Sequence, residues 1–200
     1  MSSAADSAVS VGVTAPVTRA MPKSPSRIPY PSLDNLSPSK HARVYDPTKN
    51  LLNVSHMALH ACDALWGTQA ALGRATIDAD LDPRLRELAV VRVAWLQKSD
   101  YELFHHVPLA TRFGVTETEL AAITGGNLDS LSGSDRVLID FVTQVVCDVN
   151  PSDAALSAMR AHHSDEFLFD IVVVIGSYML TARLAAVGGV QIEDQPVKSW

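Results

Sequence analysis

Residues 83–110 read PRLRELAVVRVAWLQKSDYELFHHVPLA, and this stretch decides the fold. It follows Asp82, a residue type that caps helix N-termini, and it begins with Pro83, whose missing N–H costs nothing at the first helical position. We expect one helix over 83–98 and a second over 99–113, which the next residue, a glycine, terminates. A chain reversal between them makes the two helices an antiparallel hairpin.

The hairpin brings two potential acid–base residues together. Glu87 lies eleven residues before Lys98, which is about 16 Å along a helix axis. The level position on the second helix lies about one turn beyond His106. Across helices packed roughly 8–10 Å apart, Glu87 and His106 therefore face each other. Ser99, Glu102 and His106 follow one another at spacings of three and four, which places them on one stripe of the second helix.

Each of these side chains also has an ordinary structural interpretation, and the sequence leaves both open. Glu87 fits an ion pair with Arg84, one turn earlier. Ser99 and Glu102 fit Ser-x-x-Glu, the pattern of a capping box, and this is the better account of Ser99. His106 fits a core histidine whose ring nitrogens are hydrogen-bonded.

The rest of the chain reads as consecutive helices, and no alternating polar–apolar run of strand length occurs. A capping box formed by Thr116 and Glu119 starts a short helix that ends at Gly125 and Gly126. The other expected helices span 38–45, 53–74, 134–149, 152–162 and 165–186. This pattern predicts a single all-α domain over residues 31–200.

Residues 1–30 differ from the remainder. They are rich in Ser, Ala, Val and Pro and show neither helical nor strand periodicity. Two prolines near residue 30 bias the chain toward extended geometry. A few basic residues faintly suggest an organelle transit peptide, but a disordered tail, or an extended arm laid over a neighbouring subunit, is the favoured interpretation.

Composition excludes several classes of partner. The net charge is −6 and no basic cluster occurs, which argues against nucleic acid. The longest apolar run, 169–180, is too short to span a membrane. No secretory signal is recognisable. Cys62 and Cys147 lie far apart in apolar segments and are interpreted as two buried free thiols in a reducing compartment. We expect a cytoplasmic protein.

Two histidine pairs occur, and only the first has a spacing compatible with metal binding. His56 and His60 stand at i, i+4, a spacing compatible with a metal, but neither an H-E-x-x-H motif nor a nearby third ligand accompanies them. His162 and His163 fall in the last turn of a predicted helix, where positive charge suits the helix dipole. The sequence therefore predicts no metal and no cofactor.

Taken together, these residues resemble the carboxymuconolactone decarboxylase family of the alkyl hydroperoxidase D-like superfamily, from about residue 50 to about residue 194. The family pattern has a glutamate, site positions at +12 and +15, and a histidine at +19; here these are Glu87, Ser99, Glu102 and His106. Its peroxidase branch has a Cys-x-x-Cys pair at the +12 and +15 positions. The Tyr-Glu dipeptide before the histidine, with Tyr101, looks like the decarboxylase-like branch. Further similar features are Asn53, Gly114-Val115-Thr116 with Glu119, and Ser177-Tyr178.

The resemblance implies a compact helical bundle that forms a trimer, or a hexamer built on it. It also implies a cofactor-independent lyase (decarboxylase) or isomerase that acts on a small carboxylated, lactone or cyclic metabolite, as in the breakdown of aromatic compounds. His106 is the expected acid–base group, oriented by Glu87, with Glu102 as the second carboxylate. Ser99, Tyr101 and His105 are the expected supporting or substrate-binding residues.

Two other functions remain open. One is the hydroperoxide reductase activity of the same superfamily, which is disfavoured because Ser99 and Glu102 stand where that activity needs two thiols. The other is a non-catalytic, oligomeric ligand-binding protein that has kept the fold and lost the chemistry.

Overall fold

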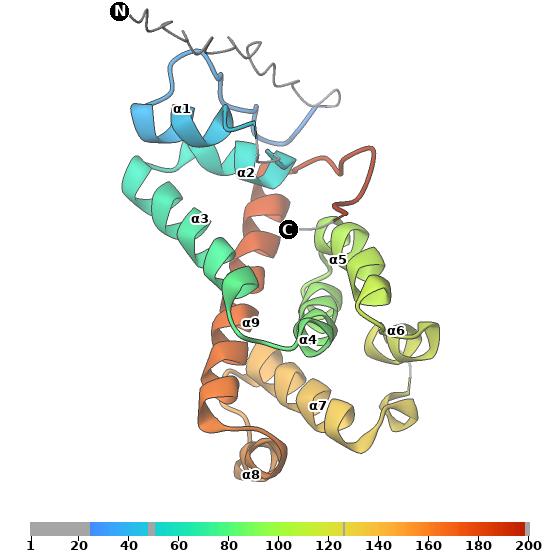
Figure 1. Cartoon of the computed structure of the whole chain (residues 1–200). Helices are drawn as coiled ribbons and strands as arrows, with labels where there is room; N and C mark the ends of the chain where they lie inside the picture. The colour runs from blue at the N-terminus through green and yellow to red at the C-terminus, as the bar shows by residue number, and fades with distance from the viewer. Residues whose placement is uncertain (1–24, 48–50, 126, 199–200) are drawn as a thin grey trace, which may run out of the picture.

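The structure is a computed structural model that describes residues 25–47, 51–125 and 127–198. The all-α prediction is confirmed, since the described residues form helices and no strands. The expected N-terminal arm lies outside the described residues over 1–24. Figure 1 shows the helices, which are α1 (Pro38–Val44), α2 (Asn53–Met57), α3 (Asp63–Asp78), α4 (Pro83–Leu96), α5 (Asp100–Arg112), α6 (Glu117–Ile123), α7 (Gly133–Asp148), α8 (Asp153–His162) and α9 (Asp165–Gly188).

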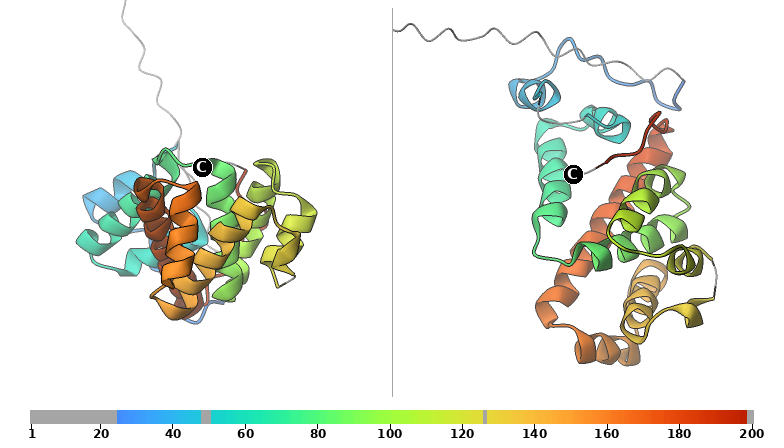
Figure 2. Two further views of the ribbon diagram at one scale, coloured as in Figure 1. Left: turned by 90° about the horizontal axis from the view of Figure 1, so that it is seen from below. Right: turned by 45° about the vertical axis from the view of Figure 1, so that its right-hand side comes forward.

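Helix α4 forms the centre of the bundle. It packs against α5, α6, α7 and α9 (Figure 1), and its residues 88–91 are fully buried. Apart from Pro83 and Trp95, its residues are buried or half-buried, so this helix belongs to the core rather than to the surface. Helix α9 runs from one end of the molecule to the other and contacts α2, α3, α4, α5, α7 and α8 (Figure 2).

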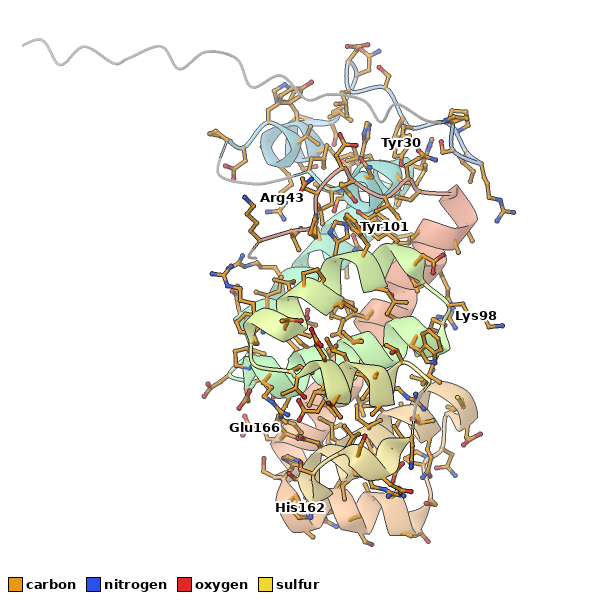
Figure 3. The ribbon with its side chains drawn as sticks, turned by 90° about the vertical axis from the view of Figure 1, so that its right-hand side faces the viewer. Tyr30, Arg43, Lys98, Tyr101, His162 and Glu166 are labelled. Carbon is orange, nitrogen blue, oxygen red and sulfur yellow. The ribbon has the colours of Figure 1, made fainter. Side chains whose placement is uncertain are left out.

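The predicted hairpin of α4 and α5 is confirmed. The Asp82 carboxylate accepts hydrogen bonds from the first backbone N–H groups of α4, and Pro83 occupies the first helical position. The chain reverses at Lys98, which has a φ of 54° and is labelled in Figure 3. The Ser99 hydroxyl then caps α5 by accepting a hydrogen bond from the backbone N–H of Glu102. Local capping residues thus determine both ends of the turn.

The expected single helix over 53–74 is wrong. The chain forms α2, a 3-10 turn and then α3, with an extended break between the last two. The ammonium group of Lys40 lies in this break, where it donates to the carbonyl oxygens of Leu59 at 3.1 Å and Ala61 at 2.7 Å. It also pairs with Asp63 at 3.1 Å. A buried cation from a distant helix therefore takes the carbonyls that a continuous helix would use internally.

The segment that precedes α1 lies against its own chain. The backbone N–H of Ile28 donates to the carbonyl of Gly188 at the end of α9, at 3.1 Å. The Nε2 atoms of His56 and His60 bond to the carbonyl oxygens of Pro31 (2.9 Å) and Pro29 (2.8 Å). This histidine pair, a candidate metal site in the sequence, therefore anchors the N-terminal segment.

Both cysteines are exposed, so the expectation of buried thiols is wrong. Cys62 lies at the N-cap position of α3 rather than inside a helix. Cys147 is in the last turn of α7, where the side chain faces away from the core. Apolar neighbours in the sequence did not indicate burial because both positions are at helix ends.

The expectation that no apolar run is long enough to span a membrane needs correction for one helix. By length and composition alone, the 24-residue α9 is long and apolar enough to cross a membrane. It is longer than the apolar run 169–180 because Ser164 caps its start and Gly189, with a φ of 61°, ends it. Its packing against six other helices also fits the core helix of a globular bundle.

Candidate active site

A cavity of about 550 Å³ opens between α3, α5 and α9. The segment before α2 and residue 197 near the C-terminus complete its wall. Its polar lining groups come from all three helices and include Gln69, Thr76, Tyr101, Glu102, His105, His106, Ser177, Tyr178 and Thr181. Of the six predicted site residues, Tyr101, Glu102, His105 and His106 line this cavity, whereas Glu87 and Ser99 lie outside its lining.

Glu87 is fully buried next to His106 on the neighbouring helix. One of its carboxylate oxygens lies 2.7 Å from His106 Nδ1, and the other accepts a hydrogen bond from Arg86 Nε at 3.3 Å. Both neighbours are nearly inaccessible to solvent. With an ionised carboxylate as its acceptor, Nδ1 is the donor, and in that tautomer of the neutral ring Nε2 is the nitrogen that can exchange a proton. The geometry that the sequence predicted for this pair is present.

Two structural interpretations of the sequence need correction. Glu87 does not pair with Arg84, which instead reaches Glu119 at 2.6 Å and Asp135 at 2.9 Å. Arg84 points toward α6 and α7. Arg86, the residue before Glu87, forms the ion pair with Glu87 instead. The Ser-x-x-Glu sequence is only half a capping box, because the serine caps α5 but the Glu102 carboxyl does not reach back to the backbone.

Glu102 is the chemically unusual group in the cavity. Its side chain is only 2 % exposed, and neither carboxyl oxygen has a hydrogen-bond partner among the described residues. Burial raises the pKa of Glu102 to about 8, with a smaller opposing effect from the Ser99 hydroxyl. The group is therefore largely protonated at neutral pH, and it lies one helical turn from His106. A neutral carboxylic acid in a cavity can donate a proton or a hydrogen bond to a ligand.

Tyr178 of α9 completes the inner wall. Its ring meets the His106 ring edge-on, with centroids 4.8 Å apart. Burial, with a further contribution from the negative charge of Glu87, raises the pKa of the tyrosine well above its usual value, so the phenol stays neutral. In the sequence this residue was noticed only as part of a family-like Ser177-Tyr178 dipeptide.

Tyr101 and His105, which are expected to be supporting or substrate-binding residues, line the cavity and also anchor the C-terminal segment. They bind Glu193, which lies in the C-terminal strap, defined here as residues 190–198. The phenol donates to Glu193 at 2.6 Å and His105 Nε2 lies 2.7 Å from the same carboxylate, while His105 Nδ1 accepts from the backbone N–H of Val197 (Figure 3 labels Tyr101). Both ring nitrogens of His105 are thus occupied, and the two residues anchor the strap that closes one side of the cavity.

Glu193 was not predicted as a functional residue. A single glutamate in a polar segment after the last helix carries no sequence signal. Although burial acts to raise its pKa, the hydrogen bonds from His105, Tyr101 and the backbone of Asn53 lower it overall. Asn53 also donates through its side chain to the carbonyl of Gln191, so the strap is held at two neighbouring points.

We expect Glu193→Ala to destabilise the protein by roughly 1–3 kcal/mol at pH 7, because it leaves two buried donors without their acceptor. A carboxylate with a lowered folded-state pKa stabilises the protein above its unfolded-state pKa, and this contribution disappears as the pH falls through the folded-state value. The difference from wild type should therefore shrink on acidification. Urea unfolding at pH 7 and pH 4 measures it, with the exposed Glu117→Ala as the control. Equal losses of stability in Glu193→Ala and Glu117→Ala would contradict the role of Glu193 as an anchor of the strap.

Within the described residues, no group of three His, Cys, Asp or Glu side chains is arranged to hold a metal ion. His162 and His163 lie at the end of α8, as predicted. There the ring of His163 stacks on Phe167, with centroids 4.2 Å apart.

Comparison with known proteins adds three findings. Residues 61–144 match the model of the carboxymuconolactone decarboxylase family, which covers both helices of the hairpin. A search of curated proteins found no relative. Among solved structures, an uncharacterised peroxidase-related protein from Ralstonia eutropha with an alkylhydroperoxidase AhpD core is similar at a TM-score of 0.71 and 22% identity, over 84% of this chain and 93% of that one.

Two further solved structures show the same fold. A putative antioxidant defence protein AhpD from Agrobacterium tumefaciens has a TM-score of 0.62 and 23% identity, over 70% of this chain and 96% of that one. A peroxidase-related protein from a Silicibacter species has a TM-score of 0.60 and 17% identity, over 70% of this chain and 76% of that one. At such identities the likeness concerns the fold.

Proposed function

This chain belongs to the carboxymuconolactone decarboxylase and AhpD-like superfamily, and on that premise we propose that it is a cofactor-independent lyase or isomerase of small carboxylated metabolites. Superfamily membership supports an enzymatic or peroxidase-related role in general. The choice of acid–base chemistry rests on one observation. At the cavity wall, the protonated carboxylic acid of Glu102, which has no hydrogen-bond partner among the described residues, stands one turn from a histidine that a buried carboxylate orients.

The two groups have complementary tasks. His106, held by Glu87, exchanges a proton with the carbon next to a carbonyl group. Glu102 donates its proton to the carbonyl oxygen, on which negative charge develops. Removal of the carbon-bound proton and its return at another carbon is an isomerisation. A β-oxo carboxylate that loses CO₂ while Glu102 protonates its carbonyl oxygen leaves the same enol. The enol carbon then takes a proton that His106 has first gained from water, and the enol O–H proton returns to Glu102.

The cavity supports a small anionic substrate. Its volume of about 550 Å³ lies within the range for small-molecule sites. Arg43 and Arg74 are part of its lining and supply positive charge for a substrate carboxylate, although Arg74 also pairs with Asp78 at 2.6 Å. Tyr178 and Thr181 offer hydroxyl groups from the opposite side. A lactone acid or a cyclic β-oxo acid matches this combination of size and charge.

The proposal is tested by following proton exchange directly. The protein is incubated in D₂O with a panel of small carboxylated lactones and β-oxo acids, and proton NMR records loss of the α-proton signals and formation of decarboxylated product. We expect catalysed exchange or CO₂ release with at least one member. Tight binding without exchange would favour the non-catalytic binding protein, and neither binding nor exchange across the panel would overturn the substrate class.

The second candidate is a hydroperoxide reductase, since the solved structures of similar fold carry peroxidase-related names. Ser99 and Glu102 occupy the positions of the thiol pair in the resemblance described above, and the two cysteines, Cys62 and Cys147, are both free. No Cys-x-x-Cys exists to lower a thiol pKa or to resolve a sulfenic acid. The lyase or isomerase proposal is therefore preferred.

We expect no thiol-dependent peroxidase activity, and we expect the double variant Cys62→Ser, Cys147→Ser to retain the exchange activity of wild type. Hydroperoxide consumption with a dithiol reductant is measured for both proteins. Exposure of both thiols makes their replacement by serine harmless to the core. A substantial wild-type rate that disappears in the double variant would place the peroxidase candidate first.

A further inference from the structure

Helix α9 has an exposed seam with coiled-coil spacing. The seam residues follow one another at alternating intervals of three and four: Glu166, Phe169, Val173, Gly176, Leu180, Arg183 and Val187. Every one of them is exposed. The four apolar side chains are 40–69 % accessible to solvent, and a Cβ added at Gly176 would meet no atom within 4 Å. Such spacing is the signature of a helix that packs against another helix along a left-handed supercoil.

The seam is not needed for the fold of the single chain. The opposite face of α9 packs into the bundle and includes the cavity residues Ser177 and Tyr178. Solvent-facing positions of an ordinary surface helix are polar, whereas here large apolar side chains recur over about 30 Å of helix. A contiguous exposed apolar strip of this kind marks an interaction surface. Figure 2 shows that α9 runs the whole length of the bundle, so a partner can contact the seam along its length.

We propose that the partner is the α9 seam of a second copy of this chain, packed antiparallel about a two-fold axis. The seam is self-complementary in only this direction. In a parallel pair, Glu166 would face Glu166 and Arg183 would face Arg183. In an antiparallel pair, layers join residues whose numbers sum to 349, so that Glu166 of one copy meets Arg183 of the other.

The same register fits the apolar layers. Phe169 then faces Leu180, and Val173 faces Gly176, whose missing side chain makes room for the valine. Each layer occurs twice because of the two-fold symmetry, as an isologous interface requires. Figure 3 labels Glu166 near one end of α9, and Arg183 lies close to the other, so the two ion pairs flank the apolar centre. Arg183 bonds to the Met179 carbonyl through one nitrogen only, so the other nitrogens of its guanidinium can donate to a partner.

The two-fold contact has a consequence for the assembly. An isologous seam joins chains in pairs, so the protein exists as a dimer, or as a hexamer if a three-fold contact lies elsewhere, but not as an isolated trimer. Because Ser177 and Tyr178 line the cavity from the other side of the same helix, pairing of two α9 helices also braces one wall of the candidate active site.

Charge reversal tests the register. Glu166→Arg and Arg183→Glu are each expected to weaken self-association at least about tenfold, because each places like charges in two symmetric layers. The double variant should restore wild-type association. An equimolar mixture of the two single variants should also associate, since each mixed pair regains both opposite-charge contacts. Sedimentation analysis over a concentration series measures the mass, and circular dichroism verifies that each variant is folded.

A larger effect is expected from Val173→Glu, which buries a charge at the centre of the interface. The matched control is Leu65→Asp, an apolar residue in the first turn of α3 that is more exposed than Val173 (68 % against 49 %) and lies where a negative charge suits the helix. This control should keep the wild-type mass, which we expect at two or six times 21.5 kDa. A monomeric or trimeric wild type, or a double variant that stays dissociated, would overturn the proposal. So would co-sedimentation of wild type with phosphatidylcholine vesicles that Val173→Glu abolishes, because the seam would then bind lipid.

Discussion

The variant His106→Asn should lose roughly 10²–10⁴-fold in turnover while remaining folded, because His106 is the group that moves the proton in the proposed reaction. It lines the cavity, its Nδ1 is bound to the fully buried Glu87 at 2.7 Å, and Glu102 lies one turn away on the same face of α5. Asparagine keeps a donor for Glu87, so the buried carboxylate retains a partner and the core is not disturbed. Proton exchange at the substrate carbon, followed by NMR, measures the loss.

His105→Asn is the matched control for this experiment. His105 is the adjacent residue, is buried to the same degree and also lines the cavity, but both of its ring nitrogens hold the C-terminal strap. We expect the control to alter stability or substrate affinity and to leave kcat within a few-fold of wild type. Full turnover in His106→Asn, or a loss of kcat in His105→Asn as large as in His106→Asn, would refute the assignment of roles.

The Glu87–His106 pair was predictable because short-range rules determine it. Capping residues define both ends of the hairpin turn, and the fixed rise per residue of a helix then sets which positions are level. Two numbers, the turn position and the rise, were enough to predict that the two side chains face each other. The same arithmetic could not say whether Arg84 or Arg86 approaches Glu87, since that depends on which other helices supply acidic partners.

Features that depend on contacts between distant segments were missed. Lys40 interrupts the expected helix over 53–74 although it lies 19 and 21 residues before the two carbonyl groups that it binds, and the sequence has no local helix breaker at the interruption. Glu193 meets Tyr101 and His105 only because the C-terminal strap folds back over α5. A sequence periodicity describes one face of one helix, so it carries no information about a lone side chain delivered by an irregular segment.

The seam of α9 is a case in which the sequence contains the relevant spacing but does not allow it to be recognised. Its three–four spacing is present in the sequence, but the run 169–180 is apolar on every face, so the spacing could not be separated from the core pattern. Only the exposed fractions divide the helix into a buried face and an exposed seam.

Replacing Glu102 by glutamine should change both activity and the pH dependence of stability. Glutamine has nearly the same shape but cannot give up a proton, so turnover should fall by about 100-fold or more. In wild type, burial raises the pKa of Glu102 to about 8 from its ordinary value of 4.5. The folded protein therefore holds this proton more tightly than the unfolded chain does. Its contribution to stability is complete below about pH 4.5 and is lost as the pH rises toward 8.

Wild type therefore loses on the order of 4 kcal/mol of folding stability between about pH 4.5 and pH 8. Glu102→Gln has no titrating group at this position and does not undergo this loss. The variant should resemble wild type in stability near pH 5 and exceed it by several kcal/mol at pH 9, as measured by urea unfolding at both values. Glu117→Gln, on the surface of α6, is the control and should follow wild type at each pH. If Glu102→Gln shows no gain at pH 9, then the carboxyl is ionised at neutral pH, and a role as proton donor is excluded. If Glu102→Gln is more stable than wild type at pH 9 and also loses turnover, then Glu102 lowers the stability of the folded protein at high pH and is retained because the reaction requires its proton.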